Sequence, residues 1–162
     1  MTGDRVRGHA VFDASGRYRY RLRRWWAPGP RVAFVMLNPN RADAVTDDPT
    51  IRRCVSFARR WSFGSVDVVN LFGYRARDPR ALLRVADPIG PENDRYLRRA
   101  IQRADLVVCA WGATRVASRR ARDVGGAVDA RSFHCLGHTL SGAPRHPLYL
   151  RRDTRLRRFS GW

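Results

Sequence analysis

One uninterrupted apolar run does most to constrain how this chain can fold. Residues Val32 to Leu37 are all apolar, and the run ends abruptly at Asn38 and Pro39. A run of this length without alternating polar residues is typical of a strand buried on both faces, as in a parallel sheet. Ligands of open α/β sheets bind in a crevice outside the carboxyl ends of the strands, and Asn38 would lie there. The segment therefore predicts both a sheet core and a place for a site.

Three more apolar runs predict further strands, and segments with helical periodicity separate them. The runs cover residues 66–72, 106–111 and 132–136, and helices are expected at about 49–62, 93–104 and 113–124. Alternating strands and helices indicate a parallel sheet with helices on both faces. We therefore expect a three-layer α/β/α fold with a central, mostly parallel sheet of about four strands. The length fits one domain over residues 1–162.

The start of the chain predicts a β-hairpin, assigned to residues 1–30 and packed on this domain. Two strand-like runs flank the turn cluster from Asp13 to Gly16. Four arginines alternate along the second run and should share one face: Arg17, Arg19, Arg21 and Arg23. They form either a solvated outer face or a row of phosphate contacts. The other end of the chain, after Leu150, is expected to form an Arg-rich turn or helix.

The charge balance is strongly basic. The chain has 32 basic and 14 acidic residues, a formal net charge of +18, and every basic residue is arginine. Such a surface attracts phosphates and favours a nucleic acid, most simply DNA, as partner. Solubility, or an acidic small molecule as ligand, remains the alternative.

Several classes of protein are disfavoured. Cys54, Cys109 and Cys135 are far apart in the sequence, which argues against a disulfide framework and against a zinc or iron–sulfur site. The glycine-rich fingerprints of dinucleotide and nucleoside triphosphate sites are missing. The apolar runs are too short for a membrane span, and the first residues lack the apolar core of a signal peptide. We expect a cytoplasmic protein without a metal, a cofactor or a membrane partner.

Three polar side chains end or interrupt apolar segments: Asn38, Asn70 and His146. Asn38 and Asn70 follow consecutive strands and should share one rim of the sheet. Neutral amides in an apolar crevice suit a planar, hydrogen-bonding ligand such as a nucleobase. His146 can donate a hydrogen bond to developing negative charge or act as an acid or base. The alternatives are a plain turn at Asn38, a bulge at Asn70 and a loop histidine at position 146.

The nearest carboxylates are Asp47 and Asp48, which flank the expected crevice and are candidate catalytic groups. Asp48 precedes Pro49, a pairing typical of a helix N-cap followed by the first helical residue. A cap is therefore the alternative role for Asp48.

Six motifs occur in order: YRYRLRRWW, VMLNPNRADAVTDDPTIRRC, VVNLFGYRARDP, DPIGPEND, AWG and HPLYL. Over nearly the whole chain this set resembles the bacterial domain-of-unknown-function family 1643. That resemblance implies no particular activity.

The order of motifs also resembles, more distantly, the uracil-DNA glycosylase superfamily. The resemblance implies that Asn38 positions the attacking water beside Pro39, that Asn70 reads the edge of an extruded base, and that His146 stabilises the departing base. Leu148, where that superfamily has serine, would be the wedge that fills the vacated stack. Arg145 would join the four hairpin arginines in binding nucleic acid.

The resulting hypothesis is a nucleic-acid-directed, glycosylase-like protein that recognises or excises an extruded base. Two alternatives stay open. One is a non-catalytic nucleic-acid-binding module of the same fold. The other is an enzyme that acts on a small nucleoside-like metabolite, with Asp47 or Asp48 as base.

Overall fold

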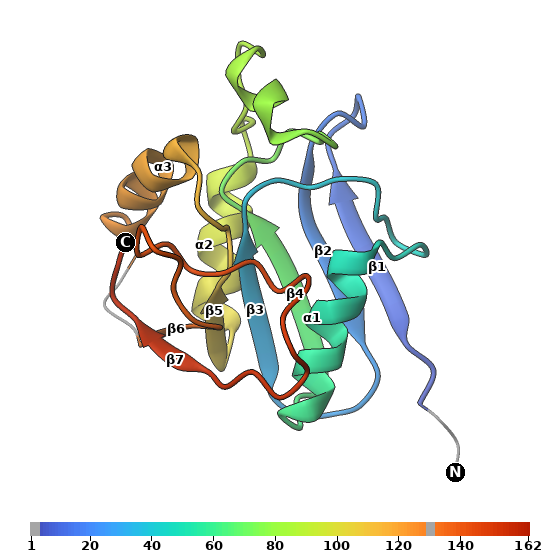
Figure 1. Cartoon of the computed structure of the whole chain (residues 1–162). Coiled ribbons are helices and arrows are strands. Elements are labelled where there is room, and N and C mark those ends of the chain that lie inside the picture. Colours follow the sequence, from blue (N-terminus) through green and yellow to red (C-terminus); the bar gives the residue numbers. More distant parts are fainter. Residues whose placement is uncertain (1–3, 129–131) are drawn as a thin grey trace.

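The computed structural model describes residues 4–128 and 132–162 (Figure 1). Its elements follow in the order β1 (Arg7–Phe12), β2 (Arg19–Trp25), β3 (Arg31–Met36), α1 (Pro49–Arg60), β4 (Ser65–Asn70), η1 (Pro79–Leu83), α2 (Asn93–Arg103), β5 (Leu106–Cys109), α3 (Arg115–Gly125), β6 (Phe133–Cys135) and β7 (Arg157–Phe159). The four strands and three helices expected in the α/β part are all present, with ends shifted by a few residues.

All seven described strands form one mixed sheet in the order β1-β2-β4-β3-β5-β6-β7. Its core is parallel, because β4, β3, β5 and β6 all run in the same direction. The expected set of about four parallel strands is therefore confirmed. The N-terminal hairpin does not merely pack on this core: β2 pairs antiparallel with β4 and extends the sheet.

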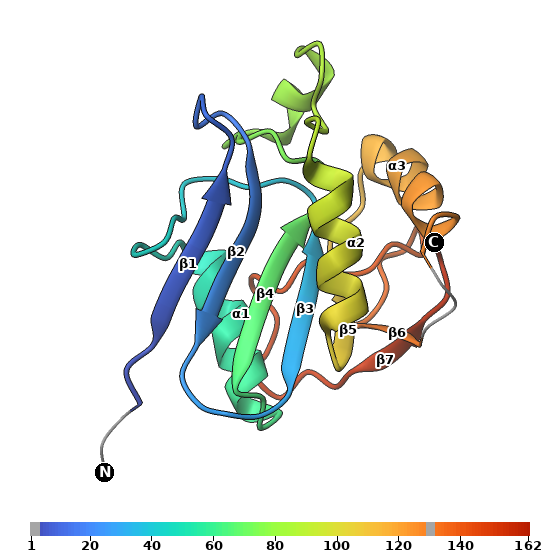
Figure 2. The same cartoon turned by 180° about the vertical axis from the view of Figure 1, so that it is seen from behind.

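Helices cover both faces of the sheet. α1 lies on one face and α2 and α3 on the other, as Figures 1 and 2 show from opposite sides. Two apolar clusters fill the space between the layers, and β3 contributes alternate residues to each, Val32 and Phe34 to one and Ala33 and Val35 to the other. This explains why the strand is apolar throughout. The three cysteines are buried in these clusters.

After Leu150 the chain forms the expected turn, at Arg152 and Asp153, and then a strand that the sequence did not predict. β7 pairs antiparallel with β6 and closes that edge of the sheet. Phe159 is buried, with its ring against Trp111 and Trp162. Three residues are too few to show a strand period, so only these tertiary contacts define the element.

The expected single row of four hairpin arginines is also wrong, because β2 contains a register shift. Val11 pairs with Arg21 and Phe12 pairs with Arg19, so Tyr20 is the extra residue of a bulge. A bulge reverses the in–out alternation beyond it. Tyr20 accordingly stacks on Tyr96 of α2, with ring centroids 5.5 Å apart.

The four arginines therefore separate. Arg19 is buried and lies on the α1 side, where its Nη1 donates to the carbonyl oxygen of Ala42 at 2.9 Å. Arg23 lies 3.7 Å from the buried carboxylate of Asp67. Arg21 is half-buried and Arg17 exposed.

No helix in the described part of the chain is long and apolar enough to cross a membrane.

Candidate functional site

A pocket of about 680 Å³ opens at the carboxyl ends of the parallel strands, where the crevice was expected. We call it the crevice pocket. Its walls come from the ends of β3 and β4, the segment after β5, the first turn of α1, and two loops near residues 76–79 and 146–149. Figure 1 shows these loops and the start of α1 around the ends of the strands.

Most of the predicted catalytic and base-contacting residues meet here. Those that line the crevice pocket are Asn38, Asp48, Asn70, His146 and Leu148. Asn38 and Asn70 become neighbours because β3 and β4 pair in parallel, with Met36 opposite Asn70. Pro39 does not line the pocket; it is buried, and its carbonyl oxygen accepts from the N–H of Ala76.

Arg19, assigned from the sequence to the outer surface, is part of the crevice pocket. It is only 2% exposed, and its Nε has no hydrogen-bond partner within the described residues. Burial lowers the pKa of Arg19 to about 10, and the nearby Asp48 carboxylate opposes that effect. Arg19 is thus a buried cation at neutral pH with an unused donor.

Asn70 presents a second unused donor. Its side chain is 2% exposed, and no partner for Nδ2 exists among the described residues. The strand end that carries it is held from behind, because Nδ2 of the fully buried Asn93 donates to the carbonyl oxygens of Asn70 and Leu71 at 2.9 and 3.2 Å. Arg120 Nε donates to the same Leu71 oxygen at 2.9 Å. This support keeps the backbone of Asn70 in place without using its side-chain amide.

Unlike that of Asn70, the side-chain Nδ2 of Asn38 has hydrogen-bond partners. Its Nδ2 donates to the carbonyl oxygens of Pro39 at 3.1 Å and Ala76 at 2.8 Å. The amide therefore ties two loops together and leaves its Oδ1, an acceptor, as the group available to a ligand or water.

Asp48 is both a helix cap and a lining residue of the crevice pocket. It is the N-cap of α1, and its Oδ1 accepts from the N–H of Ile51 at 2.9 Å. Its second oxygen accepts no hydrogen bond from the described residues, and Asp48 lines the pocket at 7% exposure. One carboxylate thus caps a helix and supplies an acceptor to the site.

His146 is held as a neutral donor. Burial lowers its pKa below the usual range, against the opposing effect of Asp48. The N–H of Leu148 donates to Nδ1 of His146 at 3.1 Å. The proton of the neutral ring is therefore on Nε2, which can donate to a ligand.

The family model described as Protein of unknown function (DUF1643) matches residues 19–148. The chain belongs to the DUF1643 family. Searches of the curated proteins and of the solved structures each find no match to it. The matched segment of this DUF1643 protein begins at Arg19 and ends at Leu148, two residues of the crevice pocket.

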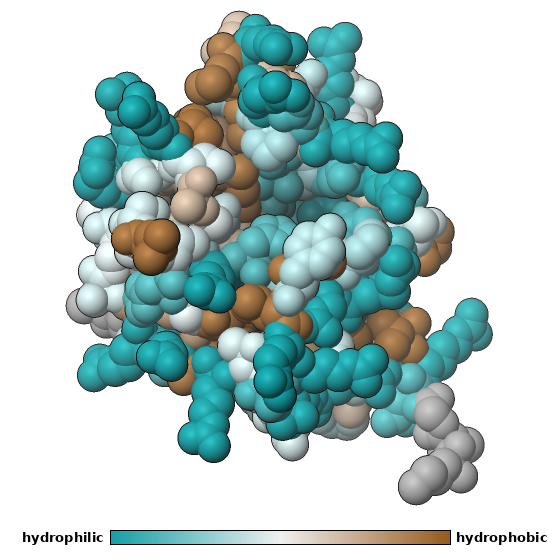
Figure 3. All heavy atoms as spheres, in the orientation of Figure 1, coloured by the Kyte–Doolittle hydropathy of each residue, from teal (hydrophilic) through white to brown (hydrophobic). Residues whose placement is uncertain are grey.

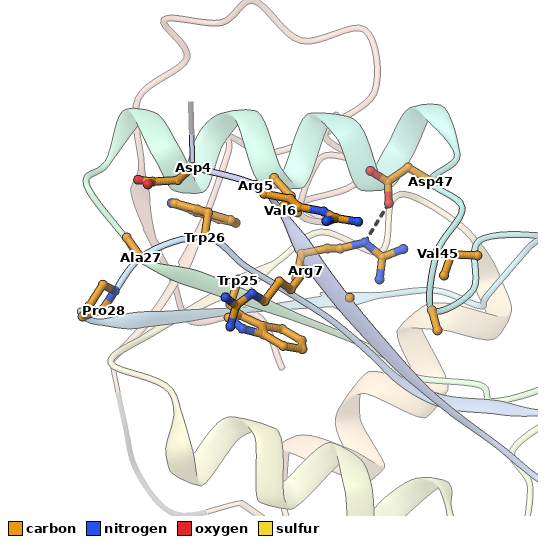
Figure 4. A pocket seen from close by; sticks show the side chains of 13 residues that line it. Asp4, Arg5, Val6, Arg7, Trp25, Trp26, Ala27, Pro28, Val45 and Asp47 are labelled. Carbon is orange, nitrogen blue, oxygen red and sulfur yellow. Dashed lines mark hydrogen bonds and ion pairs between the residues drawn. The ribbon is translucent and has the colours of Figure 1, made fainter. Parts of the chain in front are cut away.

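Asp47, the other candidate carboxylate, lies outside the crevice pocket. Its Oδ1 accepts from Arg24 Nε at 2.8 Å, beside a separate hollow of about 860 Å³ near the start of β1 (Figure 4). The buried Arg24 also donates to the carbonyl oxygens of Asp43 and Thr46. The pair therefore fixes the loop that leads into α1, and Asp48 alone faces the site.

Beside the predicted Leu148, the crevice pocket is lined by exposed residues that the sequence did not assign to the site. Leu148 is half-buried in the pocket, whereas its neighbour Tyr149 is 94% exposed at the mouth. Arg41 and Arg77 are exposed and line the mouth. Arg145 lies away from the crevice pocket, beside another hollow.

Sequence reasoning missed three contributors to this site: Trp111 in its wall, Asn93 behind it, and Arg19 within it. Trp111 lies in the motif AWG and Asn93 in the motif DPIGPEND, and these motifs indicated only a family resemblance. The sequence predicted the outer face for Arg19, and this was wrong because a bulge leaves no signal in an alternating sequence. Only the position of the bulge reveals that this arginine faces inward.

Proposed function

We propose that the crevice pocket binds a nucleobase extruded from a nucleic acid and hydrolyses its N-glycosidic bond. The observation that carries this proposal is the pair of unused buried donors, Arg19 Nε and Asn70 Nδ2. A buried donor without a partner costs about 1–3 kcal/mol, so a ligand that supplies acceptors gains from it. Two such donors favour a ligand with at least two acceptor atoms, as the edge of a base provides.

The walls suit a flat ring. Apolar side chains of Met36, Ile51, Val68 and Trp111 line the pocket between its polar groups. Extruded bases are held by hydrogen bonds to their edge and by apolar or aromatic contacts to their faces. The exposed Arg41 and Arg77 at the mouth provide positive charge where the phosphates of a polynucleotide would lie.

The chemistry follows from the charges. When the bond between the sugar C1′ and the base nitrogen breaks, its electron pair stays on the base, which becomes anionic. Arg19 and the Nε2–H of His146 stabilise that charge as it develops. Water adds to C1′ and gives its proton to the Asp48 carboxylate, and the departing base takes up a proton from solvent. Asn38 Oδ1 can hold the water, and the order of motifs that resembles the uracil-DNA glycosylase superfamily agrees with these roles.

A second candidate function has one observation in its favour. A volume of about 680 Å³ is within the range of sites that enclose a drug-sized ligand, so a complete small nucleotide also fits. The protein would then act on a free nucleoside-like metabolite. A binding module without catalysis is the third outcome that the experiment must separate.

The test is a set of oligonucleotide duplexes, each with one modified base, incubated with the protein and then treated with alkali. Scission at one kind of base supports the proposal. Cleavage of a free nucleoside alone supports the metabolite enzyme. Tight strand binding without cleavage of any substrate supports the non-catalytic module and contradicts the proposed reaction.

A matched pair of variants assigns the activity to the pocket. Arg19→Met removes the buried charge and keeps most of the volume, so we expect excision to fall at least about 100-fold. The variant should be less stable by about 1–3 kcal/mol, because the carbonyl oxygen of Ala42 loses its donor and the buried Asp48 loses its neighbouring cation, so activity is compared at a temperature where both variants are folded. Arg17→Met, at an exposed position two residues away, should leave excision unchanged. Equal activity of both variants would exclude Arg19 from the reaction.

A further inference from the structure

A second hollow of about 700 Å³ adjoins the crevice pocket, and Tyr149 lines both. We call it the basic hollow. Its lining residues come from residues 136–151 and 154–157, on the face formed by the C-terminal segment in Figure 1. Figure 3 shows this face crowded with strongly hydrophilic side chains, with apolar surface between them.

The basic hollow has an uncompensated positive charge. Four arginines line it: Arg145, Arg151, Arg155 and Arg157. Arg151 is paired with Asp153, at 3.1 Å from Nε and 3.2 Å from Nη2. The other three have no carboxylate within ion-pair distance in the described parts of the chain. Arg145 is further fixed by donation from its Nε to the carbonyl oxygen of His138 at 3.1 Å.

Tyr149 stands between the two hollows in an unusual conformation. Its side chain is 94% exposed, and its φ of 70° lies in the left-handed region that non-glycine residues seldom adopt. The loop beneath it is anchored by the buried Pro147, whose carbonyl oxygen accepts from the N–H of Leu150 at 3.3 Å. A large ring is thus held out in solvent on a fixed loop, at a local conformational cost of about 1–3 kcal/mol.

We propose that the basic hollow binds the phosphodiester backbone of a single strand next to the extruded nucleotide, and that Tyr149 stacks on the neighbouring base. Arginines that follow a backbone, together with an exposed aromatic ring, are the combination that binds single-stranded nucleic acid. This inference rests on the proposed function for the occupant of the crevice pocket. It adds that the substrate is a strand rather than a free nucleotide, and it names the residues that hold the strand on one side.

The experiment measures the binding of a fluorescently labelled single-stranded oligothymidylate of about 12 nucleotides by anisotropy over a series of salt concentrations. Each phosphate contact on a single strand contributes about 0.7 to the slope of log affinity against log salt. The double variant Arg155→Gln/Arg157→Gln should therefore reduce the slope by about 1.4 and weaken binding at every salt concentration.

The control carries the same change of charge on the far side of the sheet. Arg98→Gln/Arg99→Gln alters two exposed arginines of α2, which lies behind the sheet from the basic hollow (Figure 2). It should leave the slope and the affinity close to those of the unaltered protein. An equal loss in both double variants would mean diffuse attraction to a basic protein and would overturn the inference.

Stacking by Tyr149 is tested separately. Tyr149→Ala should weaken the binding of the strand about 10-fold without a change in salt slope, because the lost contact carries no charge. Tyr149→Phe keeps the ring and should retain the affinity. Unchanged binding in Tyr149→Ala, with an unchanged melting temperature, would contradict the role of the ring.

Two further measurements distinguish strand binding from the proposed reaction and from the binding of an acidic protein. Arg19→Met should lose excision yet keep the salt slope of strand binding, because Arg19 is buried in the crevice pocket and does not line the basic hollow, so a failure of the proposed reaction leaves the strand-binding result intact. Polyglutamate tests an acidic protein partner as occupant. If polyglutamate displaces the oligonucleotide as well as an unlabelled strand does, the hollow binds acidic chains in general and the inference is wrong.

Discussion

At the scale of single residues, the site depends on groups whose charge the fold has altered. Arg19 stays charged although it is almost completely buried, and His146 is held neutral. Burial lowers the pKa of both side chains because it disfavours their charged forms, but the pKa of Arg19, about 10, still leaves it charged at neutral pH. A neutral His146 and a charged Arg19 supply two donors of different strength to the same pocket. Neither state can be deduced from residue type alone.

The protonation of His146 gives a testable dependence of stability on pH. Its pKa is lower in the folded than in the unfolded protein, so the unfolded state takes up protons first as the pH falls. The contribution of His146 to stability should be complete above about pH 6.5 and decline as the pH falls below that value. Urea unfolding at a series of pH values should therefore show a smaller decline for His146→Gln than for the unaltered protein.

The matched control is His138→Gln, which removes an exposed histidine. Its stability should follow the curve of the unaltered protein. If the stability of His146→Gln declines with falling pH as steeply as that of His138→Gln and of the unaltered protein, His146 is not held neutral by the fold.

At the scale of elements, the N-cap of α1 is also a residue of the crevice pocket. Asp48 accepts from the N–H of Ile51 and also faces the crevice pocket. The sequence pattern Asp-Pro predicted the cap, and the structure confirms it. A helix cap and a site residue were the alternatives that the sequence pattern left open for Asp48. They are compatible, because a carboxylate has two oxygens and one can cap the helix while the other faces the pocket.

Two substitutions of Asp48 separate these roles. Asp48→Ser keeps a good N-cap, so its free energy of unfolding should stay within about 0.5 kcal/mol of the unaltered protein, whereas Asp48→Ala should lose about 1 kcal/mol. Both should lose excision by about 100-fold or more, because neither carries a carboxylate. Denaturant unfolding and the alkali assay measure the two effects. Equal destabilisation by Ser and Ala would show that the negative charge, not the cap, stabilises this end of α1.

At the scale of the whole molecule, the excess of arginine affects the stability of the fold. A formal net charge of +18 on 162 residues repels itself more in the compact than in the unfolded state. Several arginines are nonetheless used inside the fold: Arg24 fixes a loop, and Arg120 supports the end of β4. The surface charge available to a nucleic acid is therefore smaller than the composition indicates.

This repulsion predicts that salt stabilises the protein. Between about 0.01 and 1 M the Debye length falls from about 30 to about 3 Å, which screens the repulsion. The melting temperature should rise by a few degrees over that range of sodium chloride, and potassium chloride should have the same effect. A fall in the melting temperature would mean that ion pairs, such as Arg24 with Asp47, outweigh the net charge.

The sequence by itself determined the parallel core, the helices that cover it and the crevice at its edge. These follow from local patterns, because a short apolar run such as Val32–Leu37, bounded by turn residues, is typical of a strand covered on both faces. The pairing of consecutive strands also brought Asn38 and Asn70 together, as expected. Tertiary structure alone decided the inward position of Arg19, the separation of Asp47 from Asp48 and the existence of β7. The physical reason is that a bulge, a distant ion-pair partner and a three-residue strand each depend on contacts between segments far apart in the chain, which local periodicity does not record.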